Sequence, residues 1–585
     1  MSDEPAESFA GAAAAGGAAG AGGAAGTGER VARARAWLAQ DPDPQTRAEL
    51  ADLIEAAEAG DAAASADLAD RFDTRLAFGT AGLRGTLGAG SNRMNRVLVA
   101  QAAAGFAAYL LEKGGPDTPP TVVVGYDGRR NSRVFAEDSA ELFAGAGLRA
   151  ILLPRLLPTP VLAFAVRHLG ADAGVMVTAS HNPPDDNGYK VYLGGADHGS
   201  QIVPPADAEI AAHIQHIADS ADVTRLPRST SYENASEDFI EAYASATAIV
   251  APAPPSAAGL NWVYTAMHGV GWETLSRILA VAGYPAPTLV AAQIEPDGRF
   301  PTVAFPNPEE PGAMDLAFET AREAGAELVI ANDPDADRLA VAVPDPEAEG
   351  GWRRLSGNQV GLLLGWRGAQ RAVERGAAEG ASLACSLVSS PGLQAVPEHY
   401  GLAFHATLTG FKWISRAPGI VYGFEEALGY LVNPETVLDK DGISAAVALL
   451  GMVSEARGRG ASLVDLLNEF ADTFGHFASD QVSVRVEDVA VIGRIMAALR
   501  VQSPAQIGTV AVTRIDDLLQ GVDDFPPGDV LRFWLADGSR VIVRPSGTEP
   551  KLKAYLDVRG DSAEDADARL VTLTAAVKEL IDTAA

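Results

Sequence analysis

Several features are scarce in this chain, and each scarcity excludes a class of protein. Cys385 is the only cysteine among 585 residues, so no intrachain disulfide can form. Its apolar surroundings in "ASLACSLVSS" predict a buried, inert thiol. No run approaches the roughly 18 consecutive apolar residues that a spanning helix needs. The N-terminus also lacks the basic and apolar segments of a signal peptide. We therefore expect a cytoplasmic protein.

Positive charge is scarce as well. The chain has 45 basic and 76 acidic residues, a net charge of −31. Such a surface repels nucleic acid and anionic membranes, so we expect neither as a partner. It would also repel an anionic metabolite unless basic residues gather locally. Only seven residues are lysine, and five of them lie in or beside the motifs below, which suggests a need for a compact charge there. Chance placement in loops is the alternative.

The length predicts about four domains of roughly 150 residues each. A strand, a small-residue turn and a helix recur in "TVVVGYDGRRNSRVFAEDSAELF", "NWVYTAMHGVGWETLSRIL" and "ASLACSLVSSPGLQAV". This recurrence predicts three similar α/β domains in tandem. The last hundred residues favour an antiparallel sheet with helices, an α+β domain. The expected divisions are a disordered Ala/Gly-rich tail (1–28) and domains at 29–235, 236–350, 351–478 and 479–585.

Three aspartates follow an apolar strand in "ELVIANDPDADRLAVAV". Asp333, Asp335 and Asp337 are spaced so that their carboxylates can converge on one side of an extended or looped segment. Carboxylates so close together repel one another unless a cation neutralises them, and hard oxygen ligands suit Mg²⁺. An acidic surface turn is the alternative. Apolar strands on both sides favour the metal site, because they place the loop at a sheet edge.

The segment "VIVRPSGTEPKLKAYLDV" is typical of a phosphate grip. Ser546, Gly547 and Thr548 follow a strand and can offer backbone N–H groups and hydroxyls to an anion. Arg544 adds a bidentate fork and Lys551 a point charge. A helix start with a Ser-x-x-Glu-like cap is the alternative interpretation.

In "VMVTASHNPPDDNGYKVY" an apolar strand leads to Ser180 at its carboxyl end. The adjacent pair Ser180 and His181 is a poor hydrolase signal, because the Gly-x-Ser-x-Gly elbow is absent. From the residues alone, a nucleophile and a turn residue remain equally open for Ser180. A serine that carries phosphate would supply the missing ligand for a cation held by the three aspartates.

"TASHNP", "DPDADR", "GFEEALGY" and "RPSGTEPK", in this order, resemble the four signature loops of the α-D-phosphohexomutase family. The similarity extends to "FGTAGLRG", "GYDGRRNS", "YTAMHGVG", "PNPEEP" and "TGFKWI", so it covers about residues 70 to 560. The resemblance implies four domains around a central cleft. In chain order they would contribute the phosphoserine loop, the metal loop, the sugar-binding loop and the phosphate-binding loop.

The resemblance also implies roles for individual residues. Ser180 would carry the phosphate and hold one Mg²⁺ together with the aspartates. Arg84, Lys190 and Arg338 would lie beside the reacting phosphate. Lys190, with a pKa lowered by burial near cations, is the first candidate for the general acid/base, and His181 is the second. The implied substrate ligands are Thr409, Lys412, Glu425 and Glu426 for the sugar, and Arg544, Ser546, Gly547, Thr548 and Lys551 for the other phosphate.

The implied reaction interconverts hexose 1-phosphate and hexose 6-phosphate, most readily of glucose, with glucose 1,6-bisphosphate as intermediate and activator. Ala427 stands where the family often has serine, and "GFEEALGY" lacks a histidine that some members have. The forms "SHNPPDDNGYKVY" and "DKDGISAA" resemble the branch that includes phosphoglucomutase-2 and phosphopentomutase. Mannose and pentose phosphates, and a non-catalytic sugar-phosphate-binding role, are the alternatives. A monomer or homodimer is expected.

Overall fold

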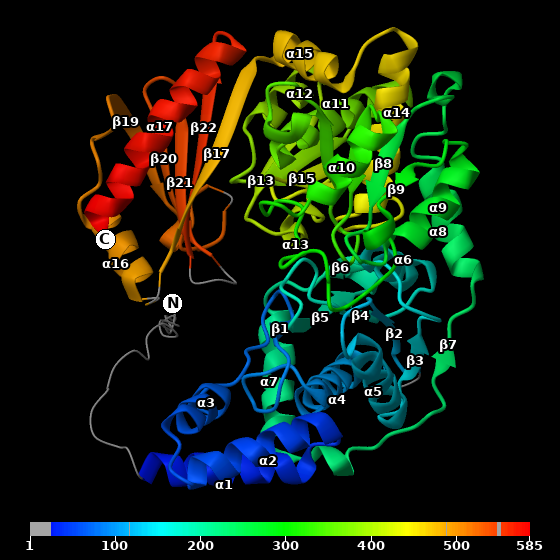
Figure 1. Cartoon of the computed structure of the whole chain (residues 1–585), viewed down its shortest axis with the longest axis vertical. Helices are drawn as coiled ribbons and strands as arrows, with labels where there is room; N and C mark the ends of the chain where they lie inside the picture. The colour runs from blue at the N-terminus through cyan, green and yellow to red at the C-terminus, as the bar shows by residue number, and fades with distance from the viewer. Residues whose placement is uncertain (1–24, 116–117, 487, 489, 524, 547–550) are drawn as a thin grey trace, which may run out of the picture.

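Four β-sheets follow one another along the chain, each built from a consecutive stretch of it (Figure 1). The computed structural model describes residues 25–115, 118–486, 488, 490–523, 525–546 and 551–585. Three helices come first: α1 (Ala25–Gln40), α2 (Pro44–Glu58) and α3 (Ala62–Phe72). They pack together, with Trp37 edge-on to Phe72 at a ring separation of 6.0 Å. Because α1 begins at Ala25, the expected disorder of residues 25–28 is wrong; the rest of that stretch lies outside the described residues.

The first sheet has the strand order β1-β5-β4-β2-β3-β7, with β6 beside β5. Its strands are β1 (Leu83–Thr86), β2 (Thr121–Tyr126), β3 (Arg149–Leu152), β4 (Ala173–Val177), β5 (Asp186–Leu193), β6 (Ser200–Gln201) and β7 (Glu233–Asn234). Its helices are α4 (Arg96–Lys113), α5 (Ser132–Gly145), α6 (Thr159–His168) and α7 (Ala206–Ser220). Strands β2, β3 and β4 are parallel, whereas β5 pairs antiparallel with both of its neighbours, β4 and β1, so the sheet is mixed. The apolar strand β4 is buried along its whole length, as expected for a strand covered on both faces.

The second and third sheets repeat this mixed pattern. The second has the order β12-β11-β10-β8-β9 and the third β14-β13-β15-β16. The second unit comprises α8 (Asp238–Ala248), β8 (Trp262–Thr265), α9 (Gly271–Ala282), β9 (Thr288–Leu289), α10 (Asp315–Ala324), β10 (Leu328–Ala331), β11 (Ala340–Pro344) and β12 (Trp352–Arg354). The third comprises α11 (Gly357–Glu374), β13 (Ser382–Ser386), α12 (Gly392–Tyr400), β14 (Ala403–Thr407), α13 (Phe411–Ile414), β15 (Ile420–Glu425), β16 (Gly429–Leu431), α14 (Gly442–Gly458) and α15 (Leu463–Phe474).

The fourth sheet is antiparallel throughout its described pairings, in the order β17-β22-β21-β20-β19-β18. Its strands are β17 (His476–Arg485), β18 (Gln506–Ile507), β19 (Val510–Asp517), β20 (Leu531–Leu535), β21 (Arg540–Pro545) and β22 (Lys551–Gly560). Helices α16 (Ala490–Val501) and α17 (Ala563–Ala584) pack on it around a core of its own. The expected α+β fold of this last unit is confirmed.

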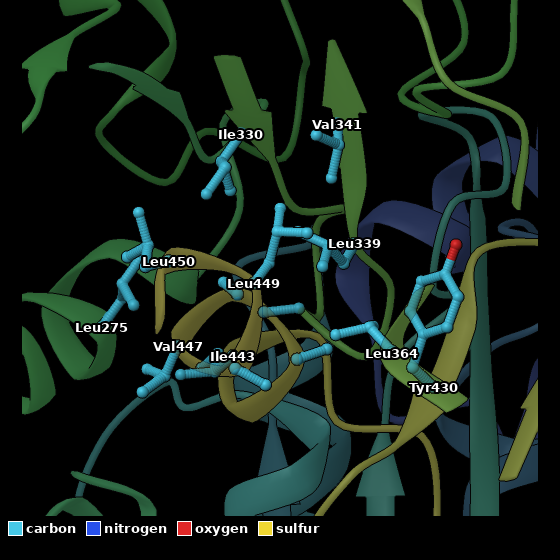
Figure 2. Packing of buried hydrophobic residues seen from close by; sticks show 14 of the residues in the cluster. Leu275, Ile330, Leu339, Val341, Leu364, Tyr430, Ile443, Val447, Leu449 and Leu450 are labelled. Carbon is cyan, nitrogen blue, oxygen red and sulfur yellow. The ribbon is translucent and has the colours of Figure 1, made fainter. Parts of the chain in front are cut away.

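Helix α14 joins the cores of the second and third units. It is apolar on all sides, which predicts burial, and most of its side chains are buried. Figure 2 shows Leu450 of α14 next to Leu275 of α9; Ile443 and Val447 of the same helix and Ile330 of β10 belong to the same cluster. One continuous hydrophobic cluster therefore connects these units. Cys385 belongs to the same cluster, and burial raises the pKa of its thiol to about 12, in agreement with an inert role.

Two of the expected domain divisions cut through sheets. Strand β12 pairs with β11, so residues 352–354 belong to the second sheet and the segment Pro344 to Gly351 is a connection within it. Strand β17 starts at His476, directly after the single residue Gly475 that follows α15. We propose to place these two divisions after Arg354 and at Gly475. Among the described residues, no helix combines the length and the apolar character that crossing a membrane requires.

Candidate active site

Ser180 lies in the connection between β4 and β5. Its backbone is left-handed, with φ of 53°, and its side chain is almost completely buried. The Ser180 N–H donates to Oγ1 of Thr178 at 2.8 Å, which fixes the turn locally. A non-glycine residue in this conformation is unusual and is found where the surroundings hold it. The backbone at Ser180 therefore forms the expected turn. This turn directs the Ser180 hydroxyl towards one carboxylate.

That partner is the aspartate loop between β10 and β11. The hydroxyl of Ser180 donates to Oδ2 of Asp333 at 3.0 Å, although the two residues lie 153 positions apart. Asp333, Asp335 and Asp337 are fully buried, and one carboxylate oxygen from each lies within 4.8 Å of the others. The loop is therefore a concentrated buried negative charge beside a hydroxyl.

The aspartate loop meets the requirements of a cation site. Oδ1 of Asp335 and Oδ1 of Asp337 are buried and have no hydrogen-bond partner among the described residues. Burial, together with the charges of Asp335 and Asp337, raises the pKa of Asp333 well above its usual range. Three carboxylates in one dry site resist simultaneous ionisation unless a cation joins them. Unpaired buried oxygens of this kind are suitable ligands for a hard divalent cation.

Cationic side chains from three units surround these carboxylates. Lys190 Nζ, on β5, lies 2.7 Å from Asp335 Oδ2 and 2.8 Å from Asp337 Oδ2. Lys440 Nζ, from the segment before α14, lies 3.4 Å from Asp337 Oδ2. The Nε atom of Arg338 lies 3.9 to 4.0 Å from the nearest oxygens of Asp337 and Asp333.

The pKa of Lys190 departs from the sequence-based expectation. Burial lowers this pKa, but Asp335 and Asp337 outweigh burial and raise it above the ordinary lysine value. The expected lowering is therefore wrong for this arrangement, because the amine contacts two carboxylates directly. Burial raises the pKa of the Asp337 carboxyl, but the charges of Lys190 and Lys440 outweigh burial and hold this pKa below its usual range.

Arg84 and His181 complete the surroundings of Ser180. Arg84, on β1, donates to Oδ1 of Asn182 at 3.1 Å, two residues beyond Ser180. Nδ1 of His181 lies 3.3 Å from the Ser180 hydroxyl oxygen. Burial and the charges of Arg338 and Arg84 keep the pKa of His181 well below its usual range, so its ring is neutral at pH 7. Both predicted residues thus lie at the serine.

Glu425 and Glu426 lie where β15 ends. Oε2 of Glu426 accepts hydrogen bonds from the hydroxyls of Ser386 and Ser389, each at 3.1 Å, and the Glu426 N–H donates to Ser389 Oγ at 3.1 Å. Burial raises the pKa of Glu425. Ser386 is the last residue of β13 and Ser389 follows that strand, which is the parallel neighbour of β15 in the same sheet. The Glu426 carboxylate is therefore held where two adjacent parallel strands end.

Two further predicted segments approach from the third and fourth units. Lys412 belongs to the "TGFKWI" stretch, which begins at Thr409. Its ammonium group hydrogen-bonds the hydroxyl of Thr80 in the "FGTAGLRG" segment. Burial lowers the pKa of Lys412, and Arg544 also lies close enough to lower it. The N–H of Ser546, directly after β21, donates to the carbonyl of Lys551, the first residue of β22, at 2.8 Å. Gly547 and Thr548 lie outside the described residues.

Two contributors were not predicted from sequence. Thr159, at the start of α6, donates to Asp335 Oδ2 at 2.6 Å. Lys440 contacts Asp337 from the third unit. The scarcity of lysine was a usable signal for Lys440, since "DKDG" contains one of only seven lysines. Nothing in "LPTP" marks Thr159, whose partner lies 176 residues away.

This constellation is suited to phosphoryl transfer. It combines a hydroxyl, three carboxylates that can hold a cation and several fixed positive charges, which together can neutralise a phosphoryl group in transit. Family models support this class along most of the chain. Residues 75–221, 237–349 and 356–474 match the alpha/beta/alpha domains I, II and III of phosphoglucomutase/phosphomannomutase, and residues 482–570 match its C-terminal domain. The chain belongs to the phosphoglucomutase/phosphomannomutase family, and it is a mutase of the α-D-phosphohexomutase type.

Individual relatives agree on the class and differ in their sugar. "Probable phosphomannomutase" of Haemophilus influenzae is 53% identical over 488 residues, 83% of this chain and 98% of that protein. Phosphopentomutase of Mus musculus is 33% identical over 569 residues, 89% of each chain. Phosphoglucomutase of Staphylococcus epidermidis is 34% identical over 519 residues, 84% of this chain and 92% of that one. A phosphoglucomutase/phosphomannomutase family protein from Burkholderia thailandensis has the same fold, with a TM-score of 0.66 at 20% identity over 87% of this chain and 98% of that chain.

Proposed function

We propose that the protein interconverts the 1-phosphate and 6-phosphate of glucose through a phosphoserine at Ser180. The observation that carries the proposal is the 3.0 Å hydrogen bond from the Ser180 hydroxyl to Asp333. It lies in a buried carboxylate cluster in which two oxygens have no hydrogen-bond partner among the described residues. A module that only bound sugar phosphate would need neither the hydroxyl nor the metal ligands. The likeness to a phosphoglucomutase over most of the chain supports the choice of glucose.

In the proposed cycle, phosphorylated Ser180 meets a sugar monophosphate. The sugar hydroxyl oxygen forms a bond to phosphorus, the bond from phosphorus to Ser180 Oγ breaks, and the product is glucose 1,6-bisphosphate. The bisphosphate turns around, and its other phosphoryl group returns to Ser180 by the reverse step. Arg84 and Arg338 neutralise the phosphoryl oxygens, so that positioning and charge account for most of the rate.

The three aspartates, with phosphorylated Ser180, would hold Mg²⁺. When bound, the ion supplies neutralisation of the phosphoryl charge. His181 is the proposed acceptor of the proton that the attacking sugar hydroxyl loses, and Lys190 is the proposed donor of the proton that Ser180 Oγ gains when its bond to phosphorus breaks; the reverse step returns both protons. Neutral His181 can accept a proton as found, whereas protonated Lys190 can donate one.

The substrate is proposed to span the third and fourth units. Thr409, Lys412, Glu425 and Glu426 are assigned to the sugar hydroxyls. Arg544, Ser546 and Lys551, with Gly547 and Thr548, are assigned to the phosphate that does not react.

The serines beneath Glu426 give a test of the sugar-binding assignment. We expect Ser386→Ala combined with Ser389→Ala to lower kcat/KM about 10- to 100-fold, mainly through KM. This range corresponds to about one hydrogen bond to a charged group, roughly 1.5–3 kcal/mol, because only the positioning of Glu426 and not the carboxylate itself is lost. Steady-state kinetics measures this. Ser382→Ala is the matched control: Ser382 is also on β13, but its hydroxyl donates to the Pro418 carbonyl. An unchanged kcat/KM in the double variant would show that Glu426 needs no such support.

A substrate panel tests the choice of sugar. Purified protein with Mg²⁺ and a catalytic amount of glucose 1,6-bisphosphate should turn over glucose 1-phosphate with the highest kcat/KM. Mannose 1-phosphate represents the sugar named in the Haemophilus influenzae relative, and ribose 1-phosphate serves as the pentose phosphate for the Mus musculus relative. A higher kcat/KM for either one replaces glucose as the substrate. If no sugar turns over and intact mass never shows phosphorylated Ser180, the mutase proposal fails.

A further inference from the structure

Arg129, in the loop after β2, holds the backbone of the Ser180 loop. Its Nη2 donates to the carbonyl oxygens of Ser180 at 2.7 Å and Asn182 at 2.5 Å. Its Nη1 donates to the carbonyl oxygens of Pro183 at 2.8 Å and Asp186 at 3.1 Å. Four carbonyls of one loop thus converge on a single guanidinium, which is 4% exposed.

These contacts determine what Arg129 can do. Both terminal nitrogens already have backbone acceptors, so the guanidinium is not placed to grip a phosphate as Arg84 and Arg338 are. Ser180 instead has its carbonyl fixed by Arg129 and its N–H fixed by Thr178. The left-handed φ of Ser180 is held from both sides of the residue. A lysine could not reproduce this fork, since its single ammonium lacks the planar spread of donors.

The second unit covers Arg129. The ring of Phe300 lies 4.9 Å from the guanidinium carbon. At Gly298 a Cβ would lie 2.7 Å from the Arg130 nitrogen and 2.9 Å from the Gly128 carbonyl oxygen, so only glycine lets the two chains approach so closely. The backbone N–H of Arg129 donates to Oδ1 of Asp127 at 3.0 Å, which fixes the main chain at the arginine. The arginine is therefore enclosed between the first and second units.

We propose that Arg129 is a positioning residue for phosphoryl transfer, which keeps the Ser180 hydroxyl aimed at the aspartate loop, and that Phe300 holds Arg129 in place from the second unit. The proposal rests on the proposed function of Ser180. It accounts for a buried arginine in "GYDGRRNS" that touches neither the carboxylate cluster nor, by its geometry, a substrate phosphate.

Arg129→Lys is the first test. We expect kcat to fall about 10- to 100-fold while KM for the sugar phosphate changes less than threefold. The rate at which glucose 1,6-bisphosphate phosphorylates Ser180, followed by intact mass in a single turnover, should fall in parallel. Arg133→Lys is the matched control, since Arg133 is exposed on α5 and pairs only with Glu137 among the described residues. That variant should stay within twofold of the parent protein.

Hydrogen exchange gives a second readout that needs no activity. Backbone amides of residues 178–187 should exchange faster in Arg129→Lys and at parental rates in Arg133→Lys. Unchanged exchange there, or a lower Tm with an unchanged phosphorylation rate per folded molecule, overturns the proposal. If the parent protein itself is never phosphorylated, the proposed function fails. The role of Arg129 in holding the Ser180 loop is then tested by hydrogen exchange alone: faster exchange in Arg129→Lys supports it, and unchanged exchange contradicts it.

Phe300→Leu keeps the proposal testable if Arg129→Lys does not fold. We expect a threefold to tenfold fall in the rate of Ser180 phosphorylation and faster exchange of the same amides. Where both variants fold, the combination should be no slower than Arg129→Lys alone, because Phe300 acts through the arginine. If the two substitutions instead lower the phosphorylation rate by the product of their separate effects, Phe300 does not act through Arg129.

Discussion

Ser180→Ala is expected to lower kcat by about 10⁴-fold or more, because it removes the hydroxyl that is proposed to carry the phosphoryl group through the cycle. Sugar phosphate binding should stay within threefold, since the proposed ligands of the sugar and of the other phosphate lie in the third and fourth units. Coupled enzyme assays measure the first quantity and isothermal titration the second. Intact mass after incubation with glucose 1,6-bisphosphate should show no phosphorylated protein.

The left-handed backbone at Ser180 calls for a second variant. Alanine tolerates φ of 53° poorly, so the substitution can disturb the loop as well as remove the hydroxyl. Ser180→Gly removes the hydroxyl and tolerates the backbone. Equal loss of turnover in both variants assigns the effect to the nucleophile. Residual turnover above about 1% in Ser180→Gly, or loss of binding alone, contradicts the phosphoserine mechanism.

The aspartate loop shows what sequence could predict. Apolar strands on both sides of "DPDAD" located the carboxylates at a sheet edge, and the structure places them there, buried and converging. This worked because strand patterning and aspartate spacing are local properties. Ser180 was harder, since its local sequence fits a turn and a nucleophile equally well. Its hydrogen bond to Asp333, 153 residues away, supports the nucleophile and is tertiary information.

Residues that act through distant partners had no local signature. Arg129 belongs to a segment that reads as a turn, and its acceptors follow more than fifty residues later. Lys190 was predicted to lie beside the reacting phosphate, and it contacts two of the aspartates. The expected direction of its pKa shift was wrong, because these nearest charges are carboxylates. The division at residue 350 failed for a related reason: the loop before β12 has the composition of a linker, whereas pairing with β11 decides its place.

Charge balance around the aspartates links the metal to the phosphoserine. Without phosphate, the three carboxylates face three cations, Lys190, Arg338 and Lys440. Phosphorylation of Ser180 adds a charge of about −1.5 to −2. A divalent cation compensates that addition, so the two charges stabilise each other in a buried site. By linkage, the free energy by which bound metal stabilises the phosphoserine equals the free energy by which phosphorylation strengthens metal binding.

Removal of Mg²⁺ by a chelator is therefore expected to lower kcat about 10²- to 10⁴-fold, reversibly, since metal ions stabilise transferring phosphoryl charge by several kcal/mol. Titration calorimetry should find Mg²⁺ bound about 10- to 100-fold more tightly by the phosphorylated protein than by Ser180→Ala. Asp335→Asn should abolish binding, because it removes the charge of a ligand whose Oδ1 has no partner among the described residues. Asp345→Asn, at the far end of β11 and paired with Arg353, should bind Mg²⁺ normally. Equal affinities for the phosphorylated protein and Ser180→Ala would show that metal and phosphoserine do not share the site.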